Sequence, residues 1–310
     1  MDDEFRTRAG FISRAGVANI HLVNQLAFYG PKGGLFERYT ADVTVEGVWK
    51  YDDFVNGNRD QDRKLHFNHN VVMRGGWRAG FSALVESFGY DADLYSAHRL
   101  VDTAPDGTAI YRPFTGTPRL ANRDFLINVG TPRVRGLQAN MFMLWGRDEN
   151  YFEWAPGDII FLNGGLFWRP TEQLRTDLTF NMQTVKRPSD GSLVNGRYLP
   201  RARIEYQLTR AMSVRWIGEY SVEKQDDLHD DSRTNLPLAI FDAGSGTYRR
   251  LTEFKRSTLR SDFLYSWQPT PGTVFFAGYG STETENPLPR IGLERVRDGF
   301  FMKLSYLFRL

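Results

Sequence analysis

The chain has 310 residues, of which 41% are apolar, and 39 basic against 37 acidic residues give a formal net charge of +2. That length suits either two soluble domains or one large β-barrel. No run approaches the ~18 consecutive apolar residues of a membrane helix, which excludes a helical membrane protein. The near-neutral charge gives no signal of nucleic-acid binding.

From the first residues we expect no export leader at the start of the chain. Met1 is followed directly by Asp2, Asp3 and Glu4, without a basic start or an apolar segment. The absence of cysteine fits an exported protein without disulfides. If the protein is exported, we expect the sequence to be a mature chain or the C-terminal part of a longer protein.

Apolar and polar residues alternate with the period of a β-strand along most of the chain. The pattern is clearest at 35–51, 174–187 and 197–223. It predicts fourteen strands, at 5–13, 19–29, 35–51, 63–74, 77–88, 122–132, 137–147, 158–168, 174–187, 197–208, 212–223, 254–268, 273–281 and 298–310.

These strands are longer than the ~5–6 residues usual in soluble sheets and reach the ~9–11 residues that cross a bilayer. One face of each is apolar and the other charged, which is the pattern of a barrel in lipid. We therefore expect an all-β fold, a transmembrane antiparallel barrel of about fourteen strands forming one outer-membrane domain over 1–310. The residues expected to face lipid are Val43, Val45, Leu178, Phe180, Ile204, Tyr206, Val214 and Trp216.

The connections alternate between short and long, as in bacterial barrels with short periplasmic turns and longer extracellular loops. The longest expected loops are 89–121 and 224–253, and both termini are then periplasmic. These two loops are long enough to cap the lumen or to bind a partner.

Aromatic residues fall at the expected strand ends, as the girdles at the two membrane boundaries require. The alternative is the scatter of aromatic residues that any β-rich protein shows. The expected girdle comprises Trp49, Tyr51, Trp77, Trp145, Trp168, Tyr198, Tyr220, Trp267 and Phe308.

The last strand alternates apolar and polar residues and is rich in aromatics. It resembles the C-terminal signal read by the barrel-insertion machinery, although the chain ends at Leu310 rather than Phe. The expected partners are therefore outer-membrane lipid and lipopolysaccharide, the insertion machinery, and a periplasmic domain or partner protein.

Three segments resemble one family of outer-membrane barrels. They are DDEFRTRAGFISR (Asp2 to Arg14), GGLFWRPTEQLRTDLTFNMQTV and GFFMKLSYLFRL. In that family, whose function is unassigned, the barrel follows a periplasmic domain similar to a carbohydrate-binding module. The resemblance implies a barrel over the whole chain and assigns no site residue.

Charged residues on the inner face of the strands are the candidate functional residues. They would tune the selectivity of a polar pore, or pair across strands and stiffen the wall, or do both. The set is Arg38, Asp42, Glu46, Arg78, Glu86, Arg175, Asp177, Arg201, Arg203, Glu205, Arg215, Glu219, Arg260 and Asp262. Parity about the turn at Arg210 places Glu205 across from Arg215 and Arg201 across from Glu219.

No catalytic, metal or cofactor site is expected. His66 and His69 are three residues apart on one strand and so face opposite sides. The acidic run at 226–231 could hold a divalent cation, but a solvated acidic loop is the favoured interpretation because the spacing is not that of a calcium loop. An enzyme with a site assembled from separate strands remains a minor alternative.

Two functions follow from this pattern. The first is a channel or transporter for small polar solutes with a mixed-charge lumen. The alternative is an anchor or partner-binding barrel with a blocked lumen. A fatty-acid transporter would need an N-terminal plug of ~40 residues, for which the chain before residue 19 is too short.

Overall fold

A computed structural model describes residues 16–285 and 292–306 of the chain. This part contains seventeen strands, all antiparallel, and one short helix. None of its helices is long or apolar enough to pass through a membrane. The all-β prediction is confirmed.

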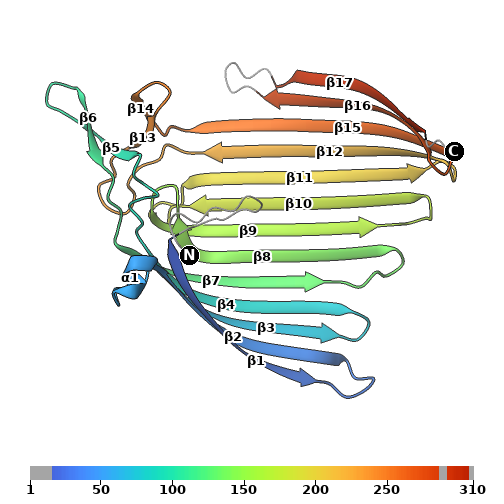
Figure 1. Cartoon of the computed structure of the whole chain (residues 1–310), viewed down its shortest axis with the longest axis horizontal. Helices are drawn as coiled ribbons and strands as arrows, with labels where there is room; N and C mark the ends of the chain where they lie inside the picture. The colour runs from blue at the N-terminus through green and yellow to red at the C-terminus, as the bar shows by residue number, and fades with distance from the viewer. Residues whose placement is uncertain (1–15, 286–291, 307–310) are drawn as a thin grey trace.

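Thirteen strands form one large sheet in which neighbours in the chain are neighbours in space (Figure 1). In sheet order they are β1 (Val17–Tyr29), β2 (Phe36–Lys50), β3 (Asp62–Met73), β4 (Trp77–Gly89), β7 (Arg119–Gly130), β8 (Leu137–Asn150), β9 (Ala155–Trp168), β10 (Leu174–Lys186), β11 (Leu193–Gln207), β12 (Met212–Gln225), β15 (Phe254–Thr270), β16 (Thr273–Glu285) and β17 (Leu293–Tyr306). Each matches one predicted strand within a few residues. The fourteenth prediction, at 5–13, lies outside the described residues.

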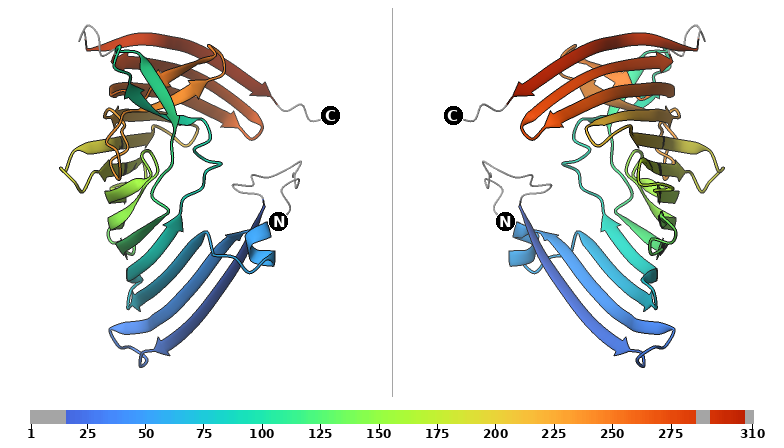
Figure 2. Two further views of the ribbon diagram at one scale, coloured as in Figure 1. Left: turned by 90° about the vertical axis from the view of Figure 1, so that its left-hand side faces the viewer. Right: turned by 90° about the vertical axis from the view of Figure 1, so that its right-hand side faces the viewer.

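The large sheet is strongly curved, and its two edge strands, β1 and β17, turn toward the same side (Figure 2). In the described part of the chain these two strands do not pair, so the sheet is open. The predicted antiparallel sheet of long strands is thus confirmed. Its closure into a barrel and the number of fourteen strands stay predictions.

The two longest connections were predicted as loops, and this is wrong in part. They contain β5 (His98–Thr103), β6 (Ala109–Pro113), β13 (Leu238–Asp242) and β14 (Thr247–Arg250). These strands form a second sheet in the order β14-β13-β5-β6. Arg99 pairs with Ala239 across it, so segments 140 residues apart in sequence meet here.

The connections alternate in length along the large sheet. At one end the strands are joined by turns of two to six residues, at 30–35, 74–76, 131–136, 169–173, 208–211 and 271–272. The tight turn between β3 and β4 uses Gly75 and Gly76, whose φ angles of 84° and 89° are costly for other residues. The opposite end carries the second sheet and α1 (Tyr51–Val55).

Two predicted features of the long-loop end need correction. Tyr51 begins α1 rather than ending a strand, because a turn of helix follows Lys50 directly. The predicted loop at 148–157 shrinks to 151–154, because β8 and β9 both continue three residues further than the alternation indicated.

Cross-strand register divides the large sheet into two faces. On β11, Ile204 alternates with Arg203 and Glu205, and its partners on β10 and β12 are Thr176 and Trp216. We call the side that carries Ile204 and Trp216 the apolar face, and the side that carries Arg203 and Glu205 the charged face. All eight residues predicted to face lipid lie on the apolar face by this register, and six of them are exposed large apolar side chains.

Candidate functional site

The charged face of the large sheet carries all fourteen charged residues selected from the sequence. The partner pairs Asp177–Arg203 and Glu205–Arg215 continue to β15, where Ile217 and Arg215 face Asp262 and Leu264. On the first strands, Glu46, Lys64 and Glu86 are successive partners. That this face lines a lumen remains a prediction.

Ion pairs connect many of these side chains. They are Lys64–Glu46 at 3.5 Å, His66–Glu86 at 2.6 Å, Arg175–Asp177 at 2.9 Å, Arg201–Glu219 at 3.8 Å, Arg203–Glu205 at 2.6 Å and Arg260–Glu219 at 4.0 Å. The predicted pairing of Arg201 with Glu219 is confirmed. Glu205 does lie across from Arg215, but its carboxylate pairs with Arg203 on its own strand.

One row of cross-strand partners on the charged face is rich in arginine. It passes through every strand of the large sheet: Tyr29, Arg38, Val72, Arg78, Gly130, Asn140, Gly165, Thr179, Arg201, Glu219, Arg260, Thr282 and Arg297. The row therefore holds five guanidinium groups and one carboxylate. Glu219 lies between two of the arginines, so the row as a whole is basic.

A surface cavity opens beside this row at the start of the sheet. Its volume is about 620 Å³, and its lining includes Arg38, Thr40, Asn70, Arg78 and Asn128. The lining also includes Glu37, so these charged, hydroxyl and amide groups together suit a small polar solute better than an apolar one.

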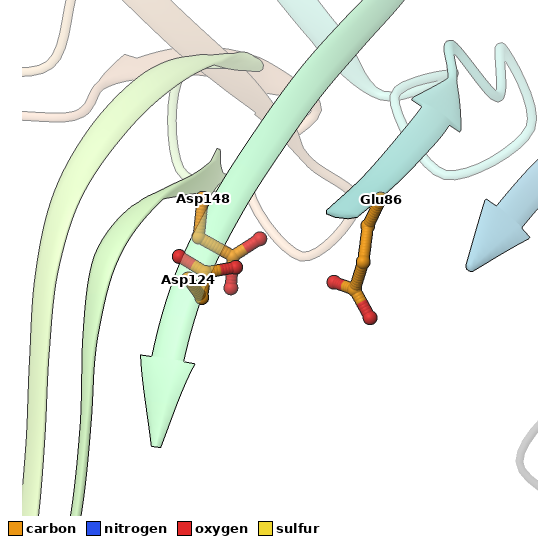
Figure 3. A group of neighbouring side chains, drawn as sticks. All are labelled: Glu86, Asp124 and Asp148. Atoms are coloured by element: carbon orange, nitrogen blue, oxygen red, sulfur yellow. The ribbon is translucent and has the colours of Figure 1, made fainter. Parts of the chain in front are cut away.

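A carboxylate cluster lies nearer the second sheet. Glu86 on β4, Asp124 on β7 and Asp148 on β8 each place a carboxylate oxygen within 4.8 Å of the others (Figure 3). Glu86 was predicted from the alternation of β4, whereas neither aspartate was predicted. The parity of β7 could have shown Asp124, whereas Asp148 fell in a segment predicted as a loop.

The second sheet and its flanking loops cover the charged face at one end (Figure 2). Tyr95 and Phe114 from one long connection pack with Trp154 between β8 and β9, and Ile159 and Val185 of the large sheet belong to the same buried cluster. We call this packed region the loop cap. Within it, Trp154 Nε1 donates a hydrogen bond to the carbonyl oxygen of Thr117 at 2.7 Å.

A buried ion pair attaches the loop cap to the large sheet. The Arg187 guanidinium, between β10 and β11, donates to Glu153 at 2.6 Å and to Asp226 at 2.8 Å. The side chains of Arg187 and Glu153 are 2% and 0% exposed. Burial alone would lower the pKa of Arg187, but the hydrogen bonds that it donates to the carboxylates of Glu153 and Asp226 outweigh this and raise the pKa. Arg187 is therefore charged and fixed in place.

The acidic run at 226–231 takes part in this packing, so the favoured interpretation as a solvated loop is wrong in part: Asp230 is buried, whereas Asp227 is exposed. Asp226 pairs with Arg187, and Asp231 accepts from Ser189 at 2.9 Å. Asp230 is buried and accepts hydrogen bonds from the backbone N–H and the hydroxyl of Thr234.

The histidines behave as expected where the structure describes their contacts. His66 contacts Glu86 on the charged face, whereas His69 bonds the hydroxyl of Tyr39 at 2.7 Å on the apolar face. The two rings lie on opposite sides of the sheet, so they do not share a ligand.

His98 gives the loop cap a pH dependence. Its Nδ1 is buried without a hydrogen-bond partner among the described residues, and its ring lies against Tyr95 and Phe114. Burial, and then the charge of Arg99, lower the pKa of His98. An unfolded histidine takes up a proton near pH ~6.5, before the folded one does. The stability of the cap is therefore complete above that pH and falls as the pH drops toward the folded pKa.

We expect proteolysis of the 90–118 connection to accelerate as the pH falls from 7.5 to about 5.5. A His98→Phe variant should lose most of this pH dependence, because it keeps the ring packing without the titrating group. A His69→Gln variant on the apolar face is the matched control. Equal acceleration in wild type and His98→Phe would contradict the assignment.

Seven of the nine predicted girdle aromatics lie on the apolar face by register. Of the other two, Tyr51 is in α1, and Phe308 lies outside the described residues. Trp49 lies flat along the sheet, with its ring where a side chain at Gly47 would project. Whether these residues mark membrane boundaries remains a prediction.

Comparison with known proteins assigns the chain to no family. No family model matches the chain, and no curated protein matches it in sequence. The two faces of the sheet and the loop cap therefore carry the functional argument.

Proposed function

We propose that the chain is an outer-membrane β-barrel of fourteen strands that forms a channel or transporter for small polar solutes. The observation that carries this is the curved sheet of thirteen long antiparallel strands with opposite chemistry on its two faces. Single-chain bacterial barrels have an even number of strands. With the strand predicted at 5–13, which lies outside the described residues, the predicted number is fourteen.

The exposure of the apolar face supports a lipid environment. Leu22, Val45, Leu178, Ile204 and Phe263 are each 39–64% exposed. Soluble proteins rarely expose continuous apolar surfaces of this extent, because each would drive association in water. A bilayer removes that cost, provided that the backbone hydrogen bonds are satisfied within the sheet.

The charged face supports a polar solute. A barrel of about fourteen strands is too wide for side chains alone to fill, since about eight strands already give a filled interior. The arginine-rich row would add a positive field inside that space, and such rings favour anions. The solute class we propose is therefore small, polar and preferentially anionic.

Conductance of the purified protein in planar bilayers tests the channel. The Arg201→Gln, Arg203→Gln double variant removes one member of the arginine-rich row and a neighbouring arginine. We expect the reversal potential under a salt gradient to shift toward that of a cation-preferring pore. The matched control is Arg123→Gln with Arg147→Gln, because these arginines are cross-strand partners on the apolar face and should leave selectivity unchanged.

The outcome of this experiment can contradict the proposal in two ways. A wild type that conducts with selectivity unaffected by the double variant would show that β11 is not at the constriction. Absence of steady conductance in the wild type would argue against an open channel.

The second candidate is an anchor or partner-binding barrel with a blocked lumen. The loop cap favours it, because buried aromatic side chains and the Arg187–Glu153 pair fix the loops over the charged face. This candidate expects no steady conductance from wild type or double variant. The charged face would then be a structural network.

A further inference from the structure

We propose that Glu86, Asp124 and Asp148, together with Asn122, form a binding site for a calcium ion on the charged face. The proposal does not rest on the channel function, because it concerns only three adjacent strands and the side chains between them. Figure 3 shows the three carboxylates, with Asp124 beside Asp148 and Glu86 on the neighbouring strand.

The register explains why these residues meet. Glu86 on β4 and Asn122 on β7 are direct cross-strand partners. Asp124 follows two residues later on the same face of β7, opposite Gly146 of β8. Asp148 is two residues beyond that glycine, so its side chain emerges beside Asn122. Three neighbouring strands thus direct oxygen atoms to one point.

Two buried oxygen atoms at this point have no partner among the described residues. They are Oδ1 of Asn122 and Oδ1 of Asp124, on side chains that are 1% and 2% exposed. Asn122 commits its amide nitrogen to Asp148 Oδ1 at 2.6 Å and to Glu149. Its amide oxygen has no partner among the described residues, although the amide nitrogen of the same group contacts Asp148. An unpaired buried acceptor destabilises the fold, and a bound cation would remove that cost.

The charge balance also favours a cation. Glu86 pairs with His66, but in the described part of the chain no ion pair joins Asp124 or Asp148 to a basic side chain. Carboxylates this close cannot all ionise without a counter-charge. Either some of them hold protons or a metal ion lies between them.

The donor atoms and their spacing fit calcium. All the available donors are oxygens, which suits Ca²⁺ or Mg²⁺ rather than a softer metal. The three carboxylate oxygens lie within 4.8 Å of one another, close enough for one Ca²⁺ with Ca–O distances of roughly 2.3–2.6 Å to contact all three.

A calcium ion here would connect the large sheet to the loop cap. Asp148 precedes Glu149, whose carboxylate accepts a hydrogen bond from Tyr151. The carbonyl oxygen of Tyr151 in turn accepts from Tyr95, at 2.6 Å, inside the cap. Fixing the end of β8 would therefore order the cap as well as the strands.

Calorimetric titration of the full chain in detergent micelles with CaCl₂, after removal of metal by chelation, tests the site. We expect one calcium ion per chain and a rise in thermal unfolding temperature with calcium. Asp124→Asn and Asp148→Asn should each weaken binding at least about tenfold, because calcium affinity follows the number of charged ligands. Asn122→Asp adds a carboxylate and should tighten it.

Asp177→Asn and Asp262→Asn are the matched controls, because both lie on the charged face outside the cluster. They should leave calcium binding unchanged, and circular dichroism establishes that each variant is folded. A wild type that binds no calcium, or binding that persists unchanged in Asp124→Asn and Asp148→Asn, would overturn the proposal. Stabilisation by Asp124→Asn in the absence of calcium, with no binding by the wild type, would show that the cluster holds protons instead.

Discussion

Replacing Glu153 with alanine is expected to destabilise the loop cap by about 3–5 kcal/mol, because it leaves the Arg187 charge buried without its main partner. The Arg187 side chain is 2% exposed and donates hydrogen bonds to Glu153 from two of its guanidinium nitrogens. Native-state proteolysis of the 226–253 connection measures the effect, since cleavage follows the population of the opened loop. The large sheet should remain intact.

Asp158→Ala is the control for this prediction. Asp158 pairs with Arg147 at 3.1 Å, but both side chains are half exposed, and such pairs contribute about 0–1 kcal/mol. The double variant Glu153→Ala, Arg187→Met should recover part of the loss, because it removes the unpaired charge. Equal proteolysis of Glu153→Ala and Asp158→Ala would show that the pair does not hold the cap.

Replacing Ile204 with arginine is expected to lower the stability of the protein in lipid by about 2–4 kcal/mol if the residue lies near the bilayer midplane. Ile204 is on the apolar face of β11, three residues before the strand ends at Gln207, and is 39% exposed. A charge there would replace apolar surface in contact with hydrocarbon. Equilibrium unfolding from lipid vesicles measures the change.

Leu199→Arg on the same strand separates the two faces. Leu199 is two residues from both Arg197 and Arg201 and therefore shares their face, the charged face, where an added arginine should cost much less. Similar losses at both positions would remove the distinction between the faces. A loss only at Leu199 would reverse the assignment.

The long strands could be predicted from the sequence because each repeats its alternation over 12–17 residues. A shift of one residue would move the whole apolar set to the wrong face, so the pattern fixes the register as well as the strand. The strands of the second sheet have only four to six residues. Pairing of Arg99 with Ala239 depends on contacts that no local pattern records.

Contacts in the candidate site could likewise be predicted only where they follow from the local alternation of a strand. The pairing of Arg201 with Glu219 follows from parity around a short turn, so it could be predicted. Three residues cannot be placed in this way. The side-chain rotamer of Glu205 determines whether its carboxylate pairs with Arg203 or with Arg215. Glu153 and Arg187 meet only because the loop cap folds back over the wall.

The pairing of β5 with β13 also dictates the order of assembly. Joining Leu100 to Leu238 while the chain is unfolded would close a loop of more than a hundred residues. The entropy of that closure is poorly compensated by a few short-strand contacts. Once β4 to β15 have formed, the same residues are already brought near one another. We therefore expect the large sheet to form before β5 pairs with β13. The last folding intermediate would then have a nearly complete large sheet and long connections that are still accessible to proteases.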